Sequence, residues 1–268
     1  MKIFKGITIA TLMLVLAGAH LSAAETEDAK QLMKRSQDAM KISNLESIST
    51  LVINDGKGNQ RVRKFSSAIK DYPSEGVKKT IMRFMEPADV RGTSFLTFEY
   101  TQAGKDNDMW LYMPALRKTR RIVSTEKSKG FMGSEFSNAD ISAPNLDDFN
   151  YKMLEGEKCG DVDCWKIESV PAKSSIADDC GYSKRLCWIG KGDLITRKTE
   201  YYDLGSKLNK VMTAQKIIVL DKEKSLYQAT NISMENVQNG RKSQITMEKS
   251  VINPAMPDSY FTTSYLEK

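Results

Sequence analysis

The sequence predicts a mainly β protein with some helix, built on one antiparallel sheet. Three observations predict this class. Strand-like runs follow one another from about residue 47 onward, the connections between them are short and polar, and only residues 26–41 carry helical spacing. Short connections favour an antiparallel, meandering order. Because 40% of the 268 residues are hydrophobic and no Pro/Ser-rich linker or internal repeat divides them, we expect one domain with a packed core.

The first 24 residues have the pattern of a secretory signal peptide. Lys2 and Lys5 precede a largely apolar run from Ile7 to Ala19, and Ser22-Ala23-Ala24 places small residues at the −3 and −1 positions. The apolar run is too short for a membrane-spanning helix. We therefore expect cleavage after Ala24, export to the periplasm, and a single mature domain over residues 25–268.

The expected elements follow in chain order. Residues 26–41 predict a helix, because the residues with i, i+3, i+4 spacing are Ala29, Leu32, Met33, Ser36 and Met40. The residues Asp55 to Asn59, with two glycines, predict a hairpin turn. The predicted strands are Ser49–Ile53, Arg61–Ala68, Val77–Met85, Phe95–Thr101, Met109–Met113, Thr119–Val123, Phe149–Glu155, Trp165–Val170, Leu186–Ile189, Leu194–Tyr202, Lys210–Leu220, Leu226–Met234 and Ser243–Val251.

A sheet of this size must bury its apolar face against something. A single helix of about four turns covers too little of it. The sheet must therefore curl on itself or enclose a cavity.

Composition excludes most enzyme classes. The only histidine, His20, lies in the predicted signal peptide, so the mature chain has no Ser-His-Asp or Cys-His site and no imidazole metal ligand. Ser67 to Lys70 and Ser124 to Lys127 fit the S-x-x-K spacing, but neither lies on a helical pattern and no S-D-N or K-T-G companion follows. We expect no enzymatic activity and no cofactor. The net charge of +6 is moderate and does not indicate nucleic acid.

Four cysteines in an exported chain favour disulfides. Cys159 and Cys164 flank a turn-like insert, and Cys180 and Cys187 bracket a second short loop. Three pairings are possible, and the pairing 159–164 with 180–187 is favoured because it closes two short loops. A four-cysteine zinc site is the alternative, although neither spacing is C-x2-C, so we expect no metal.

Two further segments have both a structural and a functional interpretation. The longest irregular stretch, Ser124 to Asp148, contains Phe131 and Met132 between two glycines and Phe136 shortly after them, so it either packs on its own sheet or meets a ligand. Just before it, four basic residues crowd five positions and form either a solvated edge strand or a docking patch. These are Arg117, Lys118, Arg120 and Arg121.

Several sequence blocks resemble a known family. They are Phe84 to Leu96 (FMEPADVRGTSFL), Trp110 to Arg117 (WLYMPALR), Arg120-Arg121-Ile122, and Phe131 to Phe136 (FMGSEF). In this order they are similar to the outer-membrane lipoprotein-sorting (LolA-like) family, in the branch associated with RND/MMPL-type exporters. The chain has Glu135 where the family commonly has Asp, and Asn138-Ala139 where an aromatic residue and an acid are expected.

The resemblance implies a half-open, strongly curved antiparallel sheet, similar to LolA and LolB, with helices that plug its concave face. It also implies a monomeric periplasmic carrier, which shelters acyl chains of a lipoprotein or lipid in an apolar cavity and moves them toward the outer membrane. Its partners would be an RND/MMPL-type inner-membrane exporter or an outer-membrane acceptor. The alternative is a regulatory or docking protein that binds an envelope membrane protein and carries nothing.

Two sets of residues are expected to serve this function. The cavity lining or lid is expected to comprise Phe84, Phe95, Phe98, Trp110, Tyr112, Met113, Phe131, Met132 and Phe136. The cavity mouth or docking surface is expected to comprise Arg91, Arg117, Arg120 and Arg121. For any one aromatic residue, ordinary core packing is the competing interpretation. On a regular strand, Phe95 cannot share a face with Leu96 or Phe98.

Overall fold

The computed structural model describes residues 29–102, 104–221 and 226–268. The predicted signal peptide and its cleavage site lie outside the described residues. Residues 29–39 are helical, within the predicted helix. No helix in the described ranges is long and apolar enough to span a bilayer.

The described residues form thirteen strands, close to those predicted. They are β1 (Asn44–Asn54), β2 (Gln60–Tyr72), β3 (Val77–Glu86), β4 (Ser94–Tyr100), β5 (Asp108–Met113), β6 (Lys118–Arg121), β7 (Phe149–Cys159), β8 (Val162–Pro171), β9 (Lys184–Gly190), β10 (Thr196–Tyr202), β11 (Leu208–Asp221), β12 (Leu226–Asn236) and β13 (Lys242–Ile252). The first hairpin turn lies at the predicted residues, where Asp55 Oδ1 accepts hydrogen bonds from the backbone of Lys57 and Asn59.

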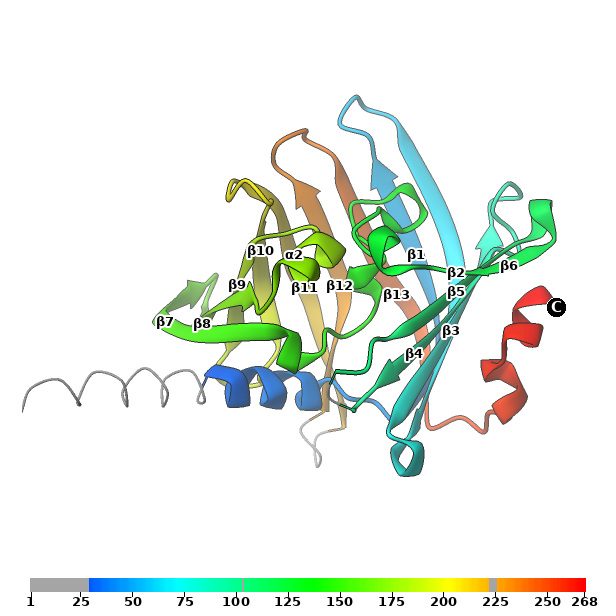
Figure 1. Cartoon of the computed structure of the whole chain (residues 1–268), viewed down its shortest axis with the longest axis horizontal. Coiled ribbons are helices and arrows are strands. Elements are labelled where there is room, and N and C mark those ends of the chain that lie inside the picture. Colours follow the sequence, from blue (N-terminus) through cyan, green and yellow to red (C-terminus); the bar gives the residue numbers. More distant parts are fainter. Residues whose placement is uncertain (1–28, 103, 222–225) are drawn as a thin grey trace, which may run out of the picture.

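All thirteen strands belong to one antiparallel sheet that does not close. Its order is β6-β5-β4-β3-β2-β1-β13-β12-β11-β10-β9-β8-β7. Every neighbouring pair is a sequential hairpin except β1 and β13, which join the two halves of the chain. Figure 1 shows the resulting strongly curved sheet, with the N-terminal helix across one end of its concave side. The predicted half-open, curved sheet is confirmed.

The two edges of the sheet, β6 and β7, are consecutive in the chain. The segment over residues 122–148 therefore connects one edge to the other across the concave side. It contains four short 3-10 turns: Ser124–Glu126, Phe131–Gly133, Ala139–Ile141 and Leu146–Asp148. We call residues 122–148 the bridging loop.

The apolar residues form three clusters. The inner core lies on the concave face and includes Leu51, Phe65, Phe84, Phe95, Phe131, Phe136 and Met234. The helix cluster packs Ala29, Leu32 and Met33 against Phe149, Tyr151, Ile167 and Cys187 of β7 to β9. The outer core lies on the convex face and comprises Ala68, Ile81, Leu96, Met256, Phe261 and Leu266. Strand parity separates Phe95 from Leu96 and Phe98 as predicted.

The helical segments that follow β8 and β13 have no counterpart among the predicted elements. Helix α2 (Ser174–Cys180) follows β8, and two 3-10 segments, η7 (Asp258–Phe261) and η8 (Thr263–Glu267), end the chain. The two C-terminal segments cover the convex face, where Phe261 meets Tyr72 at a centroid distance of 6.3 Å. Each segment is too short to show a helical period in the sequence.

The C-terminal segment should contribute measurably to stability. Phe261 is almost fully buried, so Phe261→Ala should lower the free energy of unfolding by about 3–5 kcal/mol through lost burial and the cavity left behind. Val251→Ala, at an exposed position on β13, is the control and should stay within about 0.5 kcal/mol. Urea denaturation measures both. Equal stability of the two variants would show that the segment does not cover the outer core.

Candidate functional site

An apolar hollow lies on the concave side, between the sheet, the N-terminal helix and the bridging loop. Its volume is about 340 Å³, within the range of ligand pockets. Strands β9 to β12 form the floor, and residues 138–148 of the bridging loop form part of the wall. The apolar side chains that line it include Met33, Met40, Met109, Ile122, Ile176, Met212, Ala214, Ala229 and Ile232. Four flexible methionines suit a ligand of irregular shape.

Polar contacts fix the N-terminal helix over this cavity. Ser36 donates to the Leu194 carbonyl at 2.7 Å, and Gln37 donates to the Pro144 carbonyl at 3.1 Å. Lys30 pairs with Asp147 at 2.6 Å. The helix is therefore attached both to the β9–β10 turn and to the bridging loop.

The bridging loop is anchored by a buried acid. The Glu135 carboxylate pairs with Arg241 and accepts a hydrogen bond from Asn236 at 3.1 Å. Its backbone N–H donates to Ser243 Oγ at 3.0 Å, and its carbonyl accepts from Lys210 at 2.7 Å. These contacts attach the loop to β11, β12 and β13. The packing interpretation of this segment therefore holds for residues 131–136, whereas residues 138–148 line the cavity.

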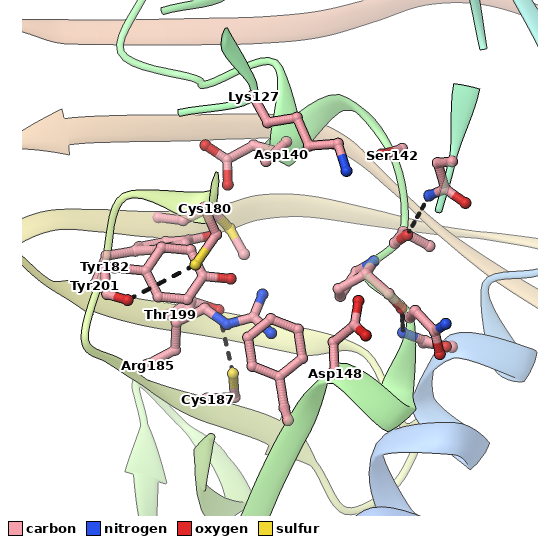
Figure 2. A pocket seen from close by; sticks show the side chains of 18 of the residues that line it. Lys127, Asp140, Ser142, Asp148, Cys180, Tyr182, Arg185, Cys187, Thr199 and Tyr201 are labelled. Atoms are coloured by element: carbon pink, nitrogen blue, oxygen red, sulfur yellow. Dashed lines mark hydrogen bonds between the residues drawn. The ribbon is translucent and has the colours of Figure 1, made fainter. Parts of the chain in front are cut away.

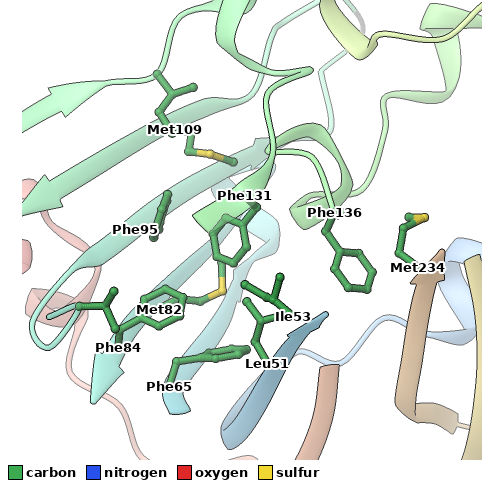
Figure 3. Packing of buried hydrophobic residues seen from close by; sticks show 12 residues of the cluster. Leu51, Ile53, Phe65, Met82, Phe84, Phe95, Met109, Phe131, Phe136 and Met234 are labelled. Atoms are coloured by element: carbon green, nitrogen blue, oxygen red, sulfur yellow. The ribbon is translucent and has the colours of Figure 1, made fainter. Parts of the chain in front are cut away.

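None of the nine residues expected to line the cavity does so. Phe84, Phe95, Phe131 and Phe136 are buried in the inner core, and Met132 packs against it. Figure 3 shows Phe131 extending from the loop toward Phe84 and Phe95, with centroid distances of 6.0 and 4.7 Å. In this structure these five residues therefore belong to the packed core rather than to the lining of the concave cavity.

The remaining four residues lie elsewhere. Phe98, Trp110 and Tyr112 face the convex side and pack against the outer core. Strand parity places Phe98 on the other face of β4 from Phe95, and places Trp110 and Tyr112 on the other face of β5 from Leu111. Met113 ends β5 and is half-buried, away from the cavity. The residues that do line the cavity include smaller aliphatic side chains as well as other aromatic ones, and their sequence spacing gives no local signal.

The four arginines expected at the mouth differ in their partners. Arg120 pairs with Glu126 at 2.6 Å, and Arg121 pairs with Asp108. Arg91 donates to the Met85 carbonyl at 3.0 Å. Arg117 is exposed and makes no ion pair within the described part of the chain. Since β6 is an edge strand, its basic residues also fit the protected-edge interpretation.

Charged residues surround the cavity entrance. Lys127 pairs with Asp106 at 3.5 Å, and the Asp140 carboxylate accepts from the backbone and hydroxyl of Ser137 at 2.7 and 2.8 Å. Burial, followed by the neighbouring Asp106 carboxylate, raises the pKa of Asp148 above its ordinary value. Figure 2 shows Asp140, Ser142 and Asp148 around the wall that faces Arg185.

The opposite wall carries a buried arginine that the sequence analysis missed. Arg185 is only 8% exposed, and its guanidinium carbon lies 4.7 Å from the Phe149 ring centroid and 5.1 Å from that of Tyr182. It makes no ion pair with any described residue, and its Nε and Nη2 have no hydrogen-bond partner among those residues. On β9 it shares a face with Cys187 and Ile189, which is the signal that could have placed it inside.

Arg185 belongs to a row of cross-strand neighbours on the concave face. Tyr151 of β7 faces Ser169 of β8, Ser169 faces Arg185, and Arg185 faces Tyr201 of β10. The Tyr151 hydroxyl and Ser169 Oγ are also buried without a partner. Burial raises the pKa of the Tyr151 and Tyr201 hydroxyls, which keeps both neutral. We call Tyr151, Ser169, Arg185 and Tyr201 the Arg185 row.

The cysteines correct the disulfide prediction, because all four are free thiols. Register pairs Cys159 with Val162 and Cys164 with Glu157, so Cys159 and Cys164 are diagonal rather than opposite neighbours. Diagonal pairs lie about 7–8 Å apart, beyond the usual disulfide range. Cys180 ends α2, and Figure 2 shows its sulfur and that of Cys187 on opposite sides of Arg185.

Gly181 sets the position of α2 beside the cavity. It caps the helix in a left-handed conformation (φ 78°), and a Cβ there would lie 2.8 Å from the Ser128 side chain. The close approach lets α2 contact the bridging loop and bring Ile176 and Cys180 to the cavity wall.

A second hollow, of about 400 Å³, lies on the convex face beside the C-terminal segment. Its lining combines apolar residues with Glu46, Ser66, Arg83, Lys249 and Ser250. It is slightly larger but more open than the concave cavity, which the sheet, the N-terminal helix and the bridging loop enclose.

Comparisons with known proteins agree with this architecture. A family model described as that of an uncharacterized protein matches residues 76–268. No curated protein matches the chain.

Three solved structures share the fold. A domain from Vibrio parahaemolyticus described as an outer membrane lipoprotein-sorting protein is 24% identical, with a TM-score of 0.82 over 91% of this chain and 100% of that one. A DUF1329 family protein from Desulfovibrio piger is 26% identical, with a TM-score of 0.83 over 90% and 99%. A LolA superfamily protein from Nitrosomonas europaea is 20% identical, with a TM-score of 0.66 over 88% and 98%.

Thiol reactivity should follow burial. Burial raises the pKa of Cys164, Cys180 and Cys187, so at neutral pH these thiols should react slowly. Cys159, half-exposed at the β7–β8 hairpin, should react first, and Cys159→Ser should abolish that fast phase. A thiol-titration assay without reductant should count all four cysteines in urea. A lower count would reveal a disulfide that the structure lacks.

Asp148 should make stability depend on pH. The folded state binds the Asp148 proton more tightly than the unfolded chain, whose carboxyl titrates near the ordinary value of 3.8, so stability is lost as pH rises through the folded pKa. Asp148→Asn should therefore raise the melting temperature at pH 7, and the gain should shrink as pH falls below 4. Thermal denaturation across this range measures it, with exposed Asp161→Asn as control. A gain of equal size at every pH would exclude titration of Asp148 as its cause.

Proposed function

We propose that the chain, which has the fold of solved outer-membrane lipoprotein-sorting and LolA superfamily proteins, is a periplasmic carrier of acyl chains. Its cargo is a lipid or the lipid anchor of a lipoprotein, held in the concave cavity. The observation that carries this proposal is the apolar hollow enclosed by the sheet, the N-terminal helix and the bridging loop.

The physical requirement for such a carrier is strict. Each CH2 group of an acyl chain exposed to water costs about 0.8 kcal/mol, so one sixteen-carbon chain outside a bilayer costs on the order of 12 kcal/mol. A carrier must offer a site almost as apolar as lipid. The floor of Met212, Ala214, Ala229 and Ile232 supplies apolar surface of this kind.

Release requires that the cover of the cavity can move. The bridging loop is attached unevenly, which supports such a motion. Residues 131–136 are buried in the inner core, whereas residues 142–147 are only partly buried and are attached to the helix by Gln37 and Lys30. We infer that the cavity opens at residues 138–148 while the aromatic part of the loop stays in place.

Transport toward the outer membrane with an RND/MMPL-type exporter is part of the same proposal. Arg117 supports a docking role best among the four expected arginines, because it is exposed and its charge is not neutralised by an ion pair with a described residue. Arg120 and Arg121 are paired within the chain. Docking therefore centres on the β5–β6 turn.

Filling the cavity should abolish cargo binding without unfolding the protein. Ala214→Phe places a ring on the cavity floor, so the affinity for a fluorescent fatty-acid analogue should fall about tenfold or more, while the free energy of unfolding falls by no more than about 3 kcal/mol. Val251→Phe, at an exposed position on β13, should bind as the wild type does. Fluorescence titration measures affinity. Unchanged binding by Ala214→Phe would show that the cargo site lies elsewhere. No binding by the wild type would contradict the carrier proposal.

A further inference from the structure

We propose that Arg185 binds the anionic head group of the cargo, so that the ligand is an amphiphile with one carboxylate or phosphate group beside its acyl chain. This inference rests on the proposed carrier function and specifies the chemical class of what is carried. It places the head group at β9 and the tail over β10 to β12.

The uncompensated charge of Arg185 favours a bound anion. A guanidinium stays charged at every physiological pH, and a buried charge without a partner is strongly unfavourable. Arg185 is buried, yet no carboxylate among the described residues lies within ion-pair distance of it. The rings of Phe149 and Tyr182 stabilise the cation only in part. A bound anion would supply the missing charge.

The hydrogen bonds that Arg185 lacks also fit an anion with two oxygens. The two unpartnered donors, Nε and Nη2, lie on the same edge of the guanidinium. That edge presents two parallel N–H groups and binds both oxygens of a carboxylate, or two oxygens of a phosphate. Buried polar atoms are nearly always hydrogen-bonded, and four in the Arg185 row are not: these two, the Tyr151 hydroxyl and Ser169 Oγ.

The acidic residues of the cavity do not take this role. Asp140 is held by Ser137, and Asp106 pairs with Lys127. Asp148 and Asp179 also line the cavity, but neither pairs with Arg185. The anion site on the Arg185 wall is therefore not occupied by a carboxylate from the described parts of the chain.

The position of the apolar floor fits an acyl chain that extends from a head group at Arg185. Arg185 lies on β9, and the small apolar residues of the floor lie on β11 and β12. Three strand spacings separate β9 from β12, which is about 14 Å along the floor. A head group at Arg185 would thus direct the acyl chain across Met212 and Ala214 toward Ile232.

Three ligands with the same sixteen-carbon tail test the inference: palmitate, hexadecyl phosphate and hexadecanol. The wild type should bind the two anions about tenfold or more tightly than the neutral alcohol. Arg185→Met should lower the affinity for the anions to the level of the alcohol and leave alcohol binding unchanged. Displacement of a neutral fluorescent lipid probe measures all affinities. The stronger anion in the wild type identifies the head group as carboxylate or phosphate.

Two further variants separate head-group binding from a structural role. Arg83→Met is the matched control, because Arg83 also lies over a tyrosine ring but has partners in Ser94 and Tyr265 on the convex side. It should keep the preference for anions. Arg185→Lys keeps the charge but loses the two-pronged donor, so it should keep only part of the preference.

The unliganded protein gives an independent readout. Removing an unpaired buried charge is neutral or stabilising, so Arg185→Met should melt at or above the temperature of the wild type when no ligand is present. A lower melting temperature together with an unchanged preference for anions would show that Arg185 is structural and would overturn the inference.

The remaining outcomes distinguish the two proposals. If the wild type binds palmitate and hexadecanol equally well, the head-group inference fails and the carrier stands. If it binds none of the three ligands, the carrier proposal fails and the inference fails with it. If Arg83→Met loses the preference for anions, the anion site lies on the convex face, and the assignment to Arg185 is wrong.

Discussion

An antiparallel sheet whose two edges are joined by one stretch of chain determines the rest of this structure. Because β6 and β7 are consecutive but lie at opposite edges, the bridging loop must cross the concave face. A one-sided apolar face has to be covered, and the loop and the N-terminal helix are the segments that cover it from within. The two segments cover it differently. The loop contributes Phe131 and Phe136 and fills its half, whereas the helix and the short side chains of β11 and β12 leave a hollow.

Much of the fold could be predicted, because it depends on local patterns. Period-2 runs between turn residues identified all thirteen strands, and the single helical pattern identified the N-terminal helix. Strand parity correctly separated Phe95 from Phe98. The cavity could not be predicted in this way, since its lining comes from segments far apart in sequence that share no motif. The large aromatic residues chosen as ligand contacts pack against one another instead.

Arg185 and the cysteines are two further cases in which the sequence alone could not place a side chain. Arg185 stands among Lys184, Leu186 and other strand residues and looks like a solvent-facing charge until the sheet is assembled. The cysteine spacing suggested a disulfide across a short loop, but the two-residue turn between β7 and β8 makes Cys159 and Cys164 diagonal neighbours. In both cases the decisive quantity is register, which a single strand does not reveal.

The pairing of β1 with β13 has a consequence for how the chain folds. All other strand pairs are hairpins that close short loops, so each half of the sheet can form early from local contacts. The seam between the halves joins residues 44–54 to residues 242–252, and closing so long a loop carries the largest entropic cost in the sheet. Contacts between such distant residues slow folding. We therefore expect two preformed meanders that dock at this seam in the rate-limiting step, with the concave face, and the hollow within it, created only at that moment.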